Sequence, residues 1–220
     1  MKLSDNTVSV LKNYSTINQN LMIKSGSKLG TMSAMKNIFA KAEVNEEFAQ
    51  DVAIYDLNEF LASLSLFENP DLDFGSDFVM MGNEGSRKSL KFWYSDPAVV
   101  SSEPKEFTMP ACEITFKLAS TELSDITRAA VVIGAPDMVL ENGSLRVTDK
   151  KNDTANHFAM EVDYENSVDE DHKFWFKVEN LKLMPGTYDV SVSKNKVSHF
   201  KNTNVDIEYF IALEPESYFG

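Results

Sequence analysis

The side chains that most often perform chemistry are sparse in this sequence and lie far apart. Its three histidines, His157, His172 and His199, show neither the His-x-x-x-His nor the His-Glu-x-x-His spacing that places two zinc ligands on one helix face. The single cysteine, Cys112, can form neither an intramolecular disulfide nor a zinc site by itself. We therefore expect no metal, a reducing compartment, and a role for Cys112 as a small buried hydrophobic residue.

Two acidic stretches resemble functional patterns. Asp71-Leu-Asp73-Phe-Gly75 begins like a calcium loop, but Gly82 stands at the twelfth position, where a bidentate glutamate is required, so we interpret it as a turn. The acid-rich run at 161–171 could bind cations or flank a pair of catalytic carboxylates, although a solvated outer loop is the favoured interpretation. Glycine-rich nucleotide loops and the Gly-x-Ser-x-Gly motif do not occur. The sequence thus predicts no enzyme and no cofactor.

Composition points to an ordinary soluble globular protein. Of 220 residues, 43% are hydrophobic and 25% charged, which excludes disordered, collagen-like and membrane-embedded classes. The net charge of −13 argues against a protein that coats nucleic acid or anionic membrane by bulk charge, so any DNA contact needs a local basic surface. The opening residues lack the apolar run of a secretory signal, and no stretch nears the roughly 20 apolar residues of a membrane span, so we expect a cytoplasmic protein without a membrane partner.

The first half of the chain alternates helix and strand patterns. Asp5 can cap a helix whose apolar positions continue at helical spacing to Ile17, and Asp56 can cap a second, shorter one that contains Leu57 and Leu64. Residues 25–36 show no clear pattern. Strand patterns occur at 21–24, 38–44, 51–55, 78–81 and 89–94.

Periodicity disappears between 95 and 110, where three prolines and several serines indicate an extended connector. We place the domain boundary there, with domain one at 1–105 and domain two at 106–220. In domain two, Ser120 or Thr121 can cap a helix with Leu123, Ile126, Ala130 and Val131 inward, and a short helix is expected at 179–184, before Pro185-Gly186. Strands are expected at 112–118, near 138, 145 and 158, and at 173–178, 188–192, 197–200 and 205–212.

The second half therefore repeats the first. The predicted class is α+β, with two similar domains that each carry antiparallel sheets and two short helices on one face. Because two short helices leave the edge strands of such sheets without partners, we expect an oligomer built edge to edge.

The polar faces of these helices contrast with the acidic whole. After Asp5 the first helix contains no acid through Asn20, and its polar side presents Lys12, which suits phosphate. Arg128 and Lys182 occupy the polar sides of the two helices expected in the second half. Taken singly, each of these cations also fits an ordinary solvated charge.

Four segments carry a resemblance to a known family, in matching order along nearly the whole chain: MKLSDNTVSVLKNYSTIN, DVAIYDLNEFLASLSL, FWFKVENLKLMPGTYDV and VDIEYFIALEPES. They resemble the sliding clamp, or DNA polymerase processivity factor, of T-even-type bacteriophages. The resemblance is weakest at 25–36 and 69–88, so no family residue is assigned to positions in these two stretches. The resemblance implies the DNA-clamp fold, assembled as a ring of three identical subunits with helices lining a hole for duplex DNA and sheets on the outside.

The resemblance also implies sites. Lys12, Arg128 and Lys182 fit sparse, sequence-independent phosphate contacts inside such a ring. The family's pocket for partner tails matches Val99, Val100, Ala212, Leu213 and Pro215, although packing at the edge of the core explains these five residues equally well. For the subunit interface we expect the strand Ser89, Leu90, Lys91, Phe92, Trp93 and Tyr94 to join an edge strand at 155–163 that contains His157, Phe158 and Met160.

The implied partners are a viral DNA polymerase, an ATP-driven clamp loader and late-transcription factors, in the cytoplasm of an infected bacterial host. Two alternatives stay open from the residues alone. A β-rich viral structural or adhesion protein without DNA contact would also be acidic and oligomeric, and an enzyme that uses paired carboxylates ranks third.

Overall fold

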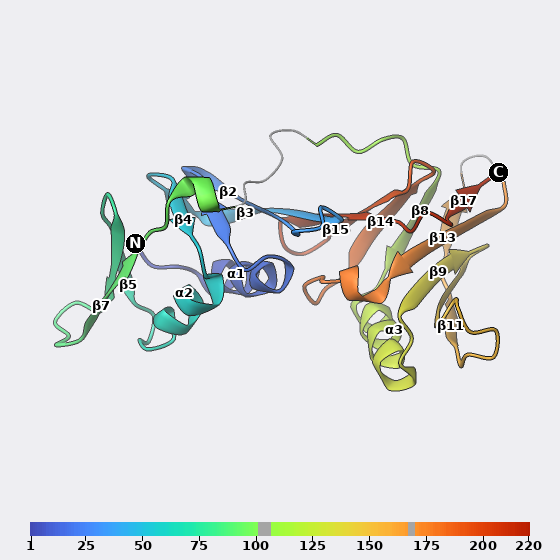
Figure 1. Cartoon of the computed structure of the whole chain (residues 1–220), viewed down its shortest axis with the longest axis horizontal. Helices are drawn as coiled ribbons and strands as arrows, with labels where there is room; N and C mark the ends of the chain where they lie inside the picture. Colours follow the sequence, from blue (N-terminus) through green and yellow to red (C-terminus); the bar gives the residue numbers. More distant parts are fainter. Residues whose placement is uncertain (101–106, 167–169) are drawn as a thin grey trace. The chain divides into compact units, whose positions relative to one another are not determined.

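The computed structural model describes residues 1–100, 107–166 and 170–220 (Figure 1). The chain forms two compact units, Met1–Lys105 and Glu106–Gly220, each with its own core. The connector predicted at 95–110 contains the 3₁₀ turn η1 (Pro97–Val99), and its central part falls outside the described residues.

The first unit places two helices beside antiparallel strands. β1 pairs with β4, β2 pairs with β3, and a three-stranded sheet has the order β5-β6-β7. The elements are α1 (Asp5–Ile17), β1 (Leu21–Ile23), β2 (Gly26–Met32), β3 (Ile38–Phe48), β4 (Val52–Ile54), α2 (Leu57–Leu64), β5 (Asp71–Phe74), β6 (Phe78–Gly82) and β7 (Ser89–Trp93).

Helix α1 begins after Ser4, whose side chain accepts a hydrogen bond from a first-turn backbone N–H that has no carbonyl partner within the helix. The Thr7 N–H donates to Ser4 Oγ at 3.3 Å, so Ser4 is the cap and the prediction of Asp5 was off by one residue. The predicted apolar stripe is buried, and the Tyr14 hydroxyl donates to the Leu29 carbonyl of β2 at 3.1 Å. α1 packs against α2 and β3, which leaves its polar side exposed.

Strand β3 carries a buried carboxylate that ties α1 to the sheet. Its inward positions are apolar until Glu46, which is only 8% exposed. The Glu46 carboxylate accepts from the Ser4 N–H and from the Thr7 hydroxyl. Burial alone would raise the pKa of Glu46, but the hydrogen bonds from Thr7 and Ser4 outweigh burial and hold the pKa below its ordinary value.

Replacement of Glu46 should therefore destabilise the first unit. We expect Glu46→Ala to cost about 1–3 kcal/mol in free energy of unfolding at pH 7, because Ser4 and Thr7 lose a charged acceptor. Because the folded-state pKa is lowered, the wild-type contribution is present above the unfolded-state pKa and is lost as the pH falls through the folded-state pKa. Urea titrations of both proteins between pH 7 and pH 3 measure this difference, which should shrink at acidic pH; a constant difference would contradict the assignment.

The second unit contains one α-helix and two antiparallel strand series. One series has the order β11-β10-β9-β13-β17, and the strands β12-β8-β14-β15-β16 lie side by side in the other. The elements are β8 (Ile114–Leu118), α3 (Ser120–Ile133), β9 (Asp137–Glu141), β10 (Ser144–Thr148), β11 (Phe158–Glu161), β12 (Tyr164–Asn166), β13 (His172–Lys177), η2 (Val178–Asn180), β14 (Tyr188–Ser193), β15 (Val197–Asn202), β16 (Ile207–Ala212) and β17 (Tyr218–Phe219).

Helix α3 corrects two predictions. Its cap residue is Ala119, not Ser120 or Thr121, and the Glu122 carboxylate accepts from the Ala119 N–H at 2.7 Å. Leu123, Ile126 and Ala130 are buried as expected, but Val131 is 80% exposed. One residue advances about 100° around a helix, so Val131 leaves the stripe that Ala130 still occupies.

The helix predicted at 179–184 was wrong: only the short 3₁₀ turn η2 forms there. Pro185 disfavours helical geometry in the preceding residue, Met184. Two tyrosines also hold the Met184 backbone, because its N–H donates to the Tyr209 hydroxyl at 3.2 Å and its carbonyl accepts from the Tyr188 hydroxyl at 2.6 Å. The described residues thus contain two α-helices in the first unit and one in the second.

Within the described residues, four strands lie where the sequence predicted none: β2, β5 and the short strands β12 and β17, of which β12 falls within the acid-rich run expected as an outer loop. β5 replaces the turn proposed at 71–75, because Leu72 packs inward between the exposed side chains of Asp71 and Asp73. β2 occupies the region without a clear pattern, where two glycines weaken strand propensity but pairing to the long β3 compensates.

Candidate DNA-facing, partner and subunit surfaces

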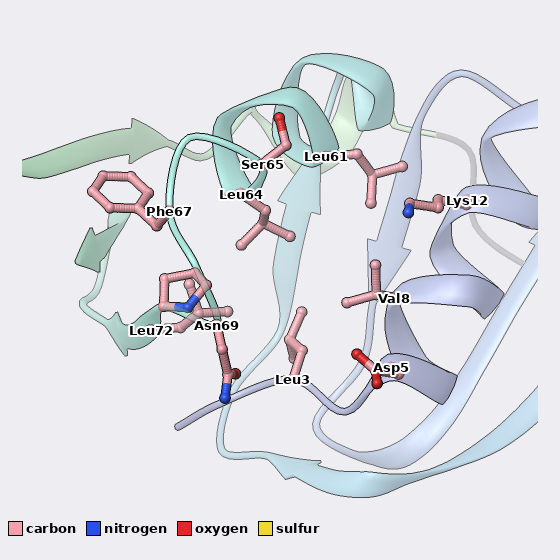
Figure 2. Close-up of a pocket in the computed structure, with 11 residues that line it drawn as sticks. Leu3, Asp5, Val8, Lys12, Leu61, Leu64, Ser65, Phe67, Asn69 and Leu72 are labelled. Carbon is pink, nitrogen blue, oxygen red and sulfur yellow. The ribbon is translucent and has the colours of Figure 1, made fainter. Parts of the chain in front are cut away.

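Lys12 lies on the exposed side of α1, at the rim of a hollow of about 220 Å³. Figure 2 shows Val8 and Lys12 on α1 facing Leu61 and Leu64 of α2 across this hollow. The lining is mainly apolar and also includes Leu3, Asp5, Ser65, Phe67, Asn69, Pro70 and Leu72. Lys12 is therefore presented beside an apolar depression rather than within a cluster of cations.

The other two predicted DNA-facing cations have different settings. Arg128 lies on the exposed side of α3, and its Nη2 pairs with Asp125 Oδ1 at 2.8 Å, which offsets its charge. Lys182 is half-buried in the segment between η2 and Pro185, so its predicted place on a helix was wrong. Only Lys12 and Arg128 of the three stand on α-helices.

The five predicted pocket residues divide between the two units. Val99 is 55% exposed in η1, whereas Val100 is buried against Met22 and Ala53 and belongs to the core of the first unit. In the second unit Ala212 is half-buried, Leu213 is 7% exposed and Pro215 is exposed. Val99 and Pro215 are thus the accessible members, and Leu213 is an apolar side chain just below the surface.

The segment 213–217 crosses from β16 to β17 and is held along its length. The Leu213 N–H donates to the Lys196 carbonyl at 2.9 Å, and the Glu214 N–H to the Trp175 carbonyl at 2.8 Å. The Ser217 hydroxyl accepts from the Trp175 N–H at 2.8 Å, and Lys196 Nζ donates to the Pro215 carbonyl. The predicted pocket residues of this segment therefore have a fixed backbone.

A group of charged side chains that the sequence did not reveal lies against this segment. Lys150 Nζ contacts Glu214 Oε2 at 3.2 Å and Glu216 Oε2 at 3.1 Å, and Lys177 Nζ contacts the buried Asp137 Oδ1 at 2.6 Å. These residues come from β9, β13, the loop after β10 and the segment itself. No spacing rule links them along the chain.

Strand β7, the predicted interface strand of the first unit, is an edge strand of its sheet. The Tyr94 N–H donates to the Asp77 carbonyl at 2.9 Å, so, by the alternation of an antiparallel ladder, the backbone groups of Phe92 and Leu90 also point to β6. The backbone groups of Ser89, Lys91 and Trp93 point to the open edge.

The side chains of β7 follow the same alternation. Phe92 lies on the helix side, where its ring meets Phe60 of α2 at 5.3 Å. Lys91 and Trp93 lie on the opposite face, and Lys91 Nζ stands 4.1 Å above the Phe78 ring and 5.1 Å from that of Trp93. Trp93 is 63% exposed. The residues with outward backbone groups are therefore those whose side chains face away from the helices.

Strand β11 is an edge strand of the second unit with the same arrangement. The Val162 N–H donates to the Gly143 carbonyl at 2.8 Å, so Met160 and Phe158 bond to β10 while Ala159 and Glu161 point their backbone groups outward. Met160 and Phe158 oppose the buried Leu145 and Val147, on the core face that α3 covers. The exposed His157 precedes β11.

The histidines and the cysteine singled out in the sequence lie apart from one another. Among the residues that the structure describes, no group of three or more histidine, cysteine or acidic side chains could hold a metal ion. His172 is buried between Tyr164 and Phe174, while burial, together with Glu113, raises the pKa of the half-buried Cys112 thiol. No helix in the described ranges is long and apolar enough to span a membrane.

Helices backed by antiparallel sheets in two units define the class of protein: the fold is that of the DNA clamps. A structure described as the C-terminal region of FEN-1 bound to A. fulgidus PCNA superposes with a TM-score of 0.71 at 12% identity, covering 96% of this chain and 95% of the other. Residues 3–74 match the family described as DNA polymerase processivity factor, and residues 116–215 match the C-terminal part of the gp45 sliding clamp.

Relatives that match over nearly their whole length belong to the same class of protein. The sliding clamp of Vibrio phage KVP40 is 34% identical over 97% of this chain and 99% of its own length, and that of Enterobacteria phage T4 is 28% identical over 99% and 98%. The chain belongs to the phage sliding clamps, a non-catalytic family, and acts as a DNA polymerase processivity factor. This membership excludes the alternatives of a structural or adhesion protein and of a carboxylate enzyme.

Proposed function

We propose that this clamp works as a homotrimeric ring that encircles duplex DNA and tethers the viral polymerase, with subunits joined by antiparallel addition of β7 to β11. The observation that carries this proposal is the matched alternation of the two edge strands. Each presents free backbone donors and acceptors every second residue, which is what strand addition requires.

Side-chain direction supports the same joint. Residues directly opposite each other in an antiparallel pair put their side chains on the same face. The outward-bonding residues Lys91 and Ala159 both face away from the helices of their units, so a joint between them leaves α2 and α3 on one common face. If the alternation of either strand were shifted by one residue, the helices would fall on opposite faces. A ring needs this common face for its DNA-lining helices.

Partner proteins should bind at the predicted pocket residues, of which Val99 and Pro215 are exposed and Leu213 is buried close to Pro215 in the sequence. The A. fulgidus clamp is described with the C-terminal region of FEN-1 bound, which supports recognition of partner tails in this fold. We assign the tail of the viral polymerase to these positions, and an ATP-driven clamp loader and late-transcription factors as further partners. The working environment is the cytoplasm of an infected bacterial host.

The test of this function is polymerase processivity on primed circular DNA with the viral polymerase, clamp loader and ATP. We expect long products only when clamp, loader and ATP are all present, and clamp retention on closed circles but not on linear DNA. Equal retention on both templates would contradict topological enclosure.

The proposed DNA contacts of Lys12, Arg128 and Lys182 can be tested together. Each exposed contact with mobile, hydrated DNA should contribute less than about 1 kcal/mol, so single alanine variants should differ little from wild type. The triple alanine variant should shorten residence on circular DNA, while its trimer mass and peptide binding stay unchanged. Normal residence over a range of salt concentrations would exclude these residues as the lining and favour other lysines, such as the exposed Lys28 of β2 or Lys196.

A further inference from the structure

Lys150 holds a nearly buried ammonium group between two glutamates of the segment 213–217. Its side chain is only 10% exposed, and its Nζ lies 3.2 Å from Glu214 and 3.1 Å from Glu216. Burial lowers the pKa of Lys150, but the hydrogen bonds that its ammonium donates to Glu216 and Glu214 outweigh burial and raise the pKa above its ordinary value. Lys150 is therefore charged at neutral pH and pairs with two carboxylates at once.

A second layer of charges anchors Lys150 to the sheet. Asp137 on β9 is 1% exposed and accepts from the Lys150 N–H at 3.1 Å and from Lys177 Nζ at 2.6 Å. Lys177 also lies 3.9 Å from Glu214. Positive and negative groups thus alternate from Asp137 through Lys177, Glu214 and Lys150 to Glu216, and the strands fix one end of this series.

The glutamates of this series alternate with the proposed partner-binding residues. Leu213 and Pro215 flank Glu214, and Pro215 lies between Glu214 and Glu216. The Glu214 N–H bonds to the Trp175 carbonyl of β13, and the Ser217 N–H returns to the Glu214 carbonyl at 3.0 Å. The two carboxylates that Lys150 pairs therefore belong to the same short segment that presents Leu213 and Pro215.

We propose that Lys150 is a positioning residue for partner binding, which holds the segment 213–217 in the conformation that a polymerase tail recognises. Lys150 does not touch the tail; it acts by pairing Glu214 and Glu216, which repel each other without it. This inference rests on the pocket proposed above.

Fluorescence anisotropy with a labelled peptide from the polymerase C-terminus tests the proposal. We expect Lys150→Met to weaken binding by about fivefold or more, because the partly buried Glu214 carboxylate and the exposed Glu216 carboxylate lose the ammonium group that they share. Lys151→Met is the matched control, since the Lys151 side chain is exposed next to Lys150, and its affinity should equal wild type. Lys150→Arg keeps the charge and should restore most of the affinity.

Removing the two glutamate charges as well distinguishes a positioning role of Lys150 from a general loss of stability. Adding Glu214→Gln and Glu216→Gln to Lys150→Met removes the repulsion and should recover affinity to within about threefold of wild type, as expected for coupled groups. Amide exchange at Glu214 and Ser217 should speed up in Lys150→Met and slow again in the triple variant. Glu216→Lys, at a side chain 60% exposed and so tolerant of change, should weaken binding as well.

The outcomes are distinct. Wild-type affinity for a folded Lys150→Met or Glu216→Lys clamp would overturn the positioning role, and so would a triple variant that stays as weak as Lys150→Met. If the wild-type clamp binds no polymerase peptide, or if Leu213→Asp binds as tightly as wild type, the pocket itself is wrong and the failure belongs to the proposed function.

Discussion

The Lys91→Pro clamp should be a folded monomer. Lys91 points its N–H to the open edge of β7, so proline at this position removes a donor that only a neighbouring subunit would use and adds a steric block to strand addition. Mass measurement by light scattering should give one subunit instead of three at micromolar concentration, with an unchanged far-UV spectrum. Retention on circular DNA should disappear with the trimer.

Two neighbouring variants make this experiment specific. Lys91→Ala removes the same side chain but keeps the backbone donor, and it should remain trimeric. Leu90→Pro should damage the β6–β7 hairpin itself, because the Leu90 N–H points to β6, and it should therefore lower thermal stability as well as trimer content. A trimeric, folded Lys91→Pro protein would rule out β7 as the interface strand.

Leu213→Asp should reduce the affinity for the polymerase peptide by well over tenfold, because an apolar anchor is replaced by a charge that the bound peptide would bury. The trimer should survive, since Leu213 is not on either edge strand. Because Leu213 is only 7% exposed, the charge should also lower the stability of the second unit, so the affinity is compared at a temperature at which thermal melting shows the variant to be folded. Anisotropy titration and light scattering on the same sample measure both properties.

Valines 99 and 100 provide a contrast for this second experiment. Val99→Asp should weaken peptide binding with little effect on stability, because Val99 is 55% exposed. Val100→Asp should destabilise the first unit, because Val100 is buried with Met22 and Ala53. Unchanged affinity in both Leu213→Asp and Val99→Asp would place the partner site elsewhere.

Sequence reasoning succeeded where one local pattern determined the outcome. The apolar stripe from Thr7 to Ile17 and the Asp56 cap located α1 and α2, and the edge-to-edge hypothesis selected two strands that do lie at sheet edges. The alternation of β3 also contained an unused signal: Glu46 falls at an inward position between Val44 and Phe48, which indicates a buried carboxylate with partners.

Sequence reasoning failed where contacts with distant parts of the chain decide the local structure. The tyrosines that hold Met184 and prevent a helix at 179–184 lie on β14 and β16, and β2 exists because β3 pairs with it. The two glutamates that pair with Lys150 lie more than sixty positions away along the chain. Charge pairs of this kind have no periodicity that a single sequence could display.

In the proposed joint between subunits, the two-residue alternation of β7 and β11 allows only discrete registers. A slip of the joint by one residue would place the helices of the two joined units on opposite faces. The next acceptable register therefore lies two residues away, a shift of about 6.8 Å along the strands. A head-to-tail contact closes into a ring only when its rotation returns the last copy to the first, and otherwise it continues as a helix. In the proposed trimer, three joints in one register would give a flat ring. One slipped joint would instead give an open ring whose ends no longer meet, a geometric route for duplex DNA to enter without any subunit unfolding.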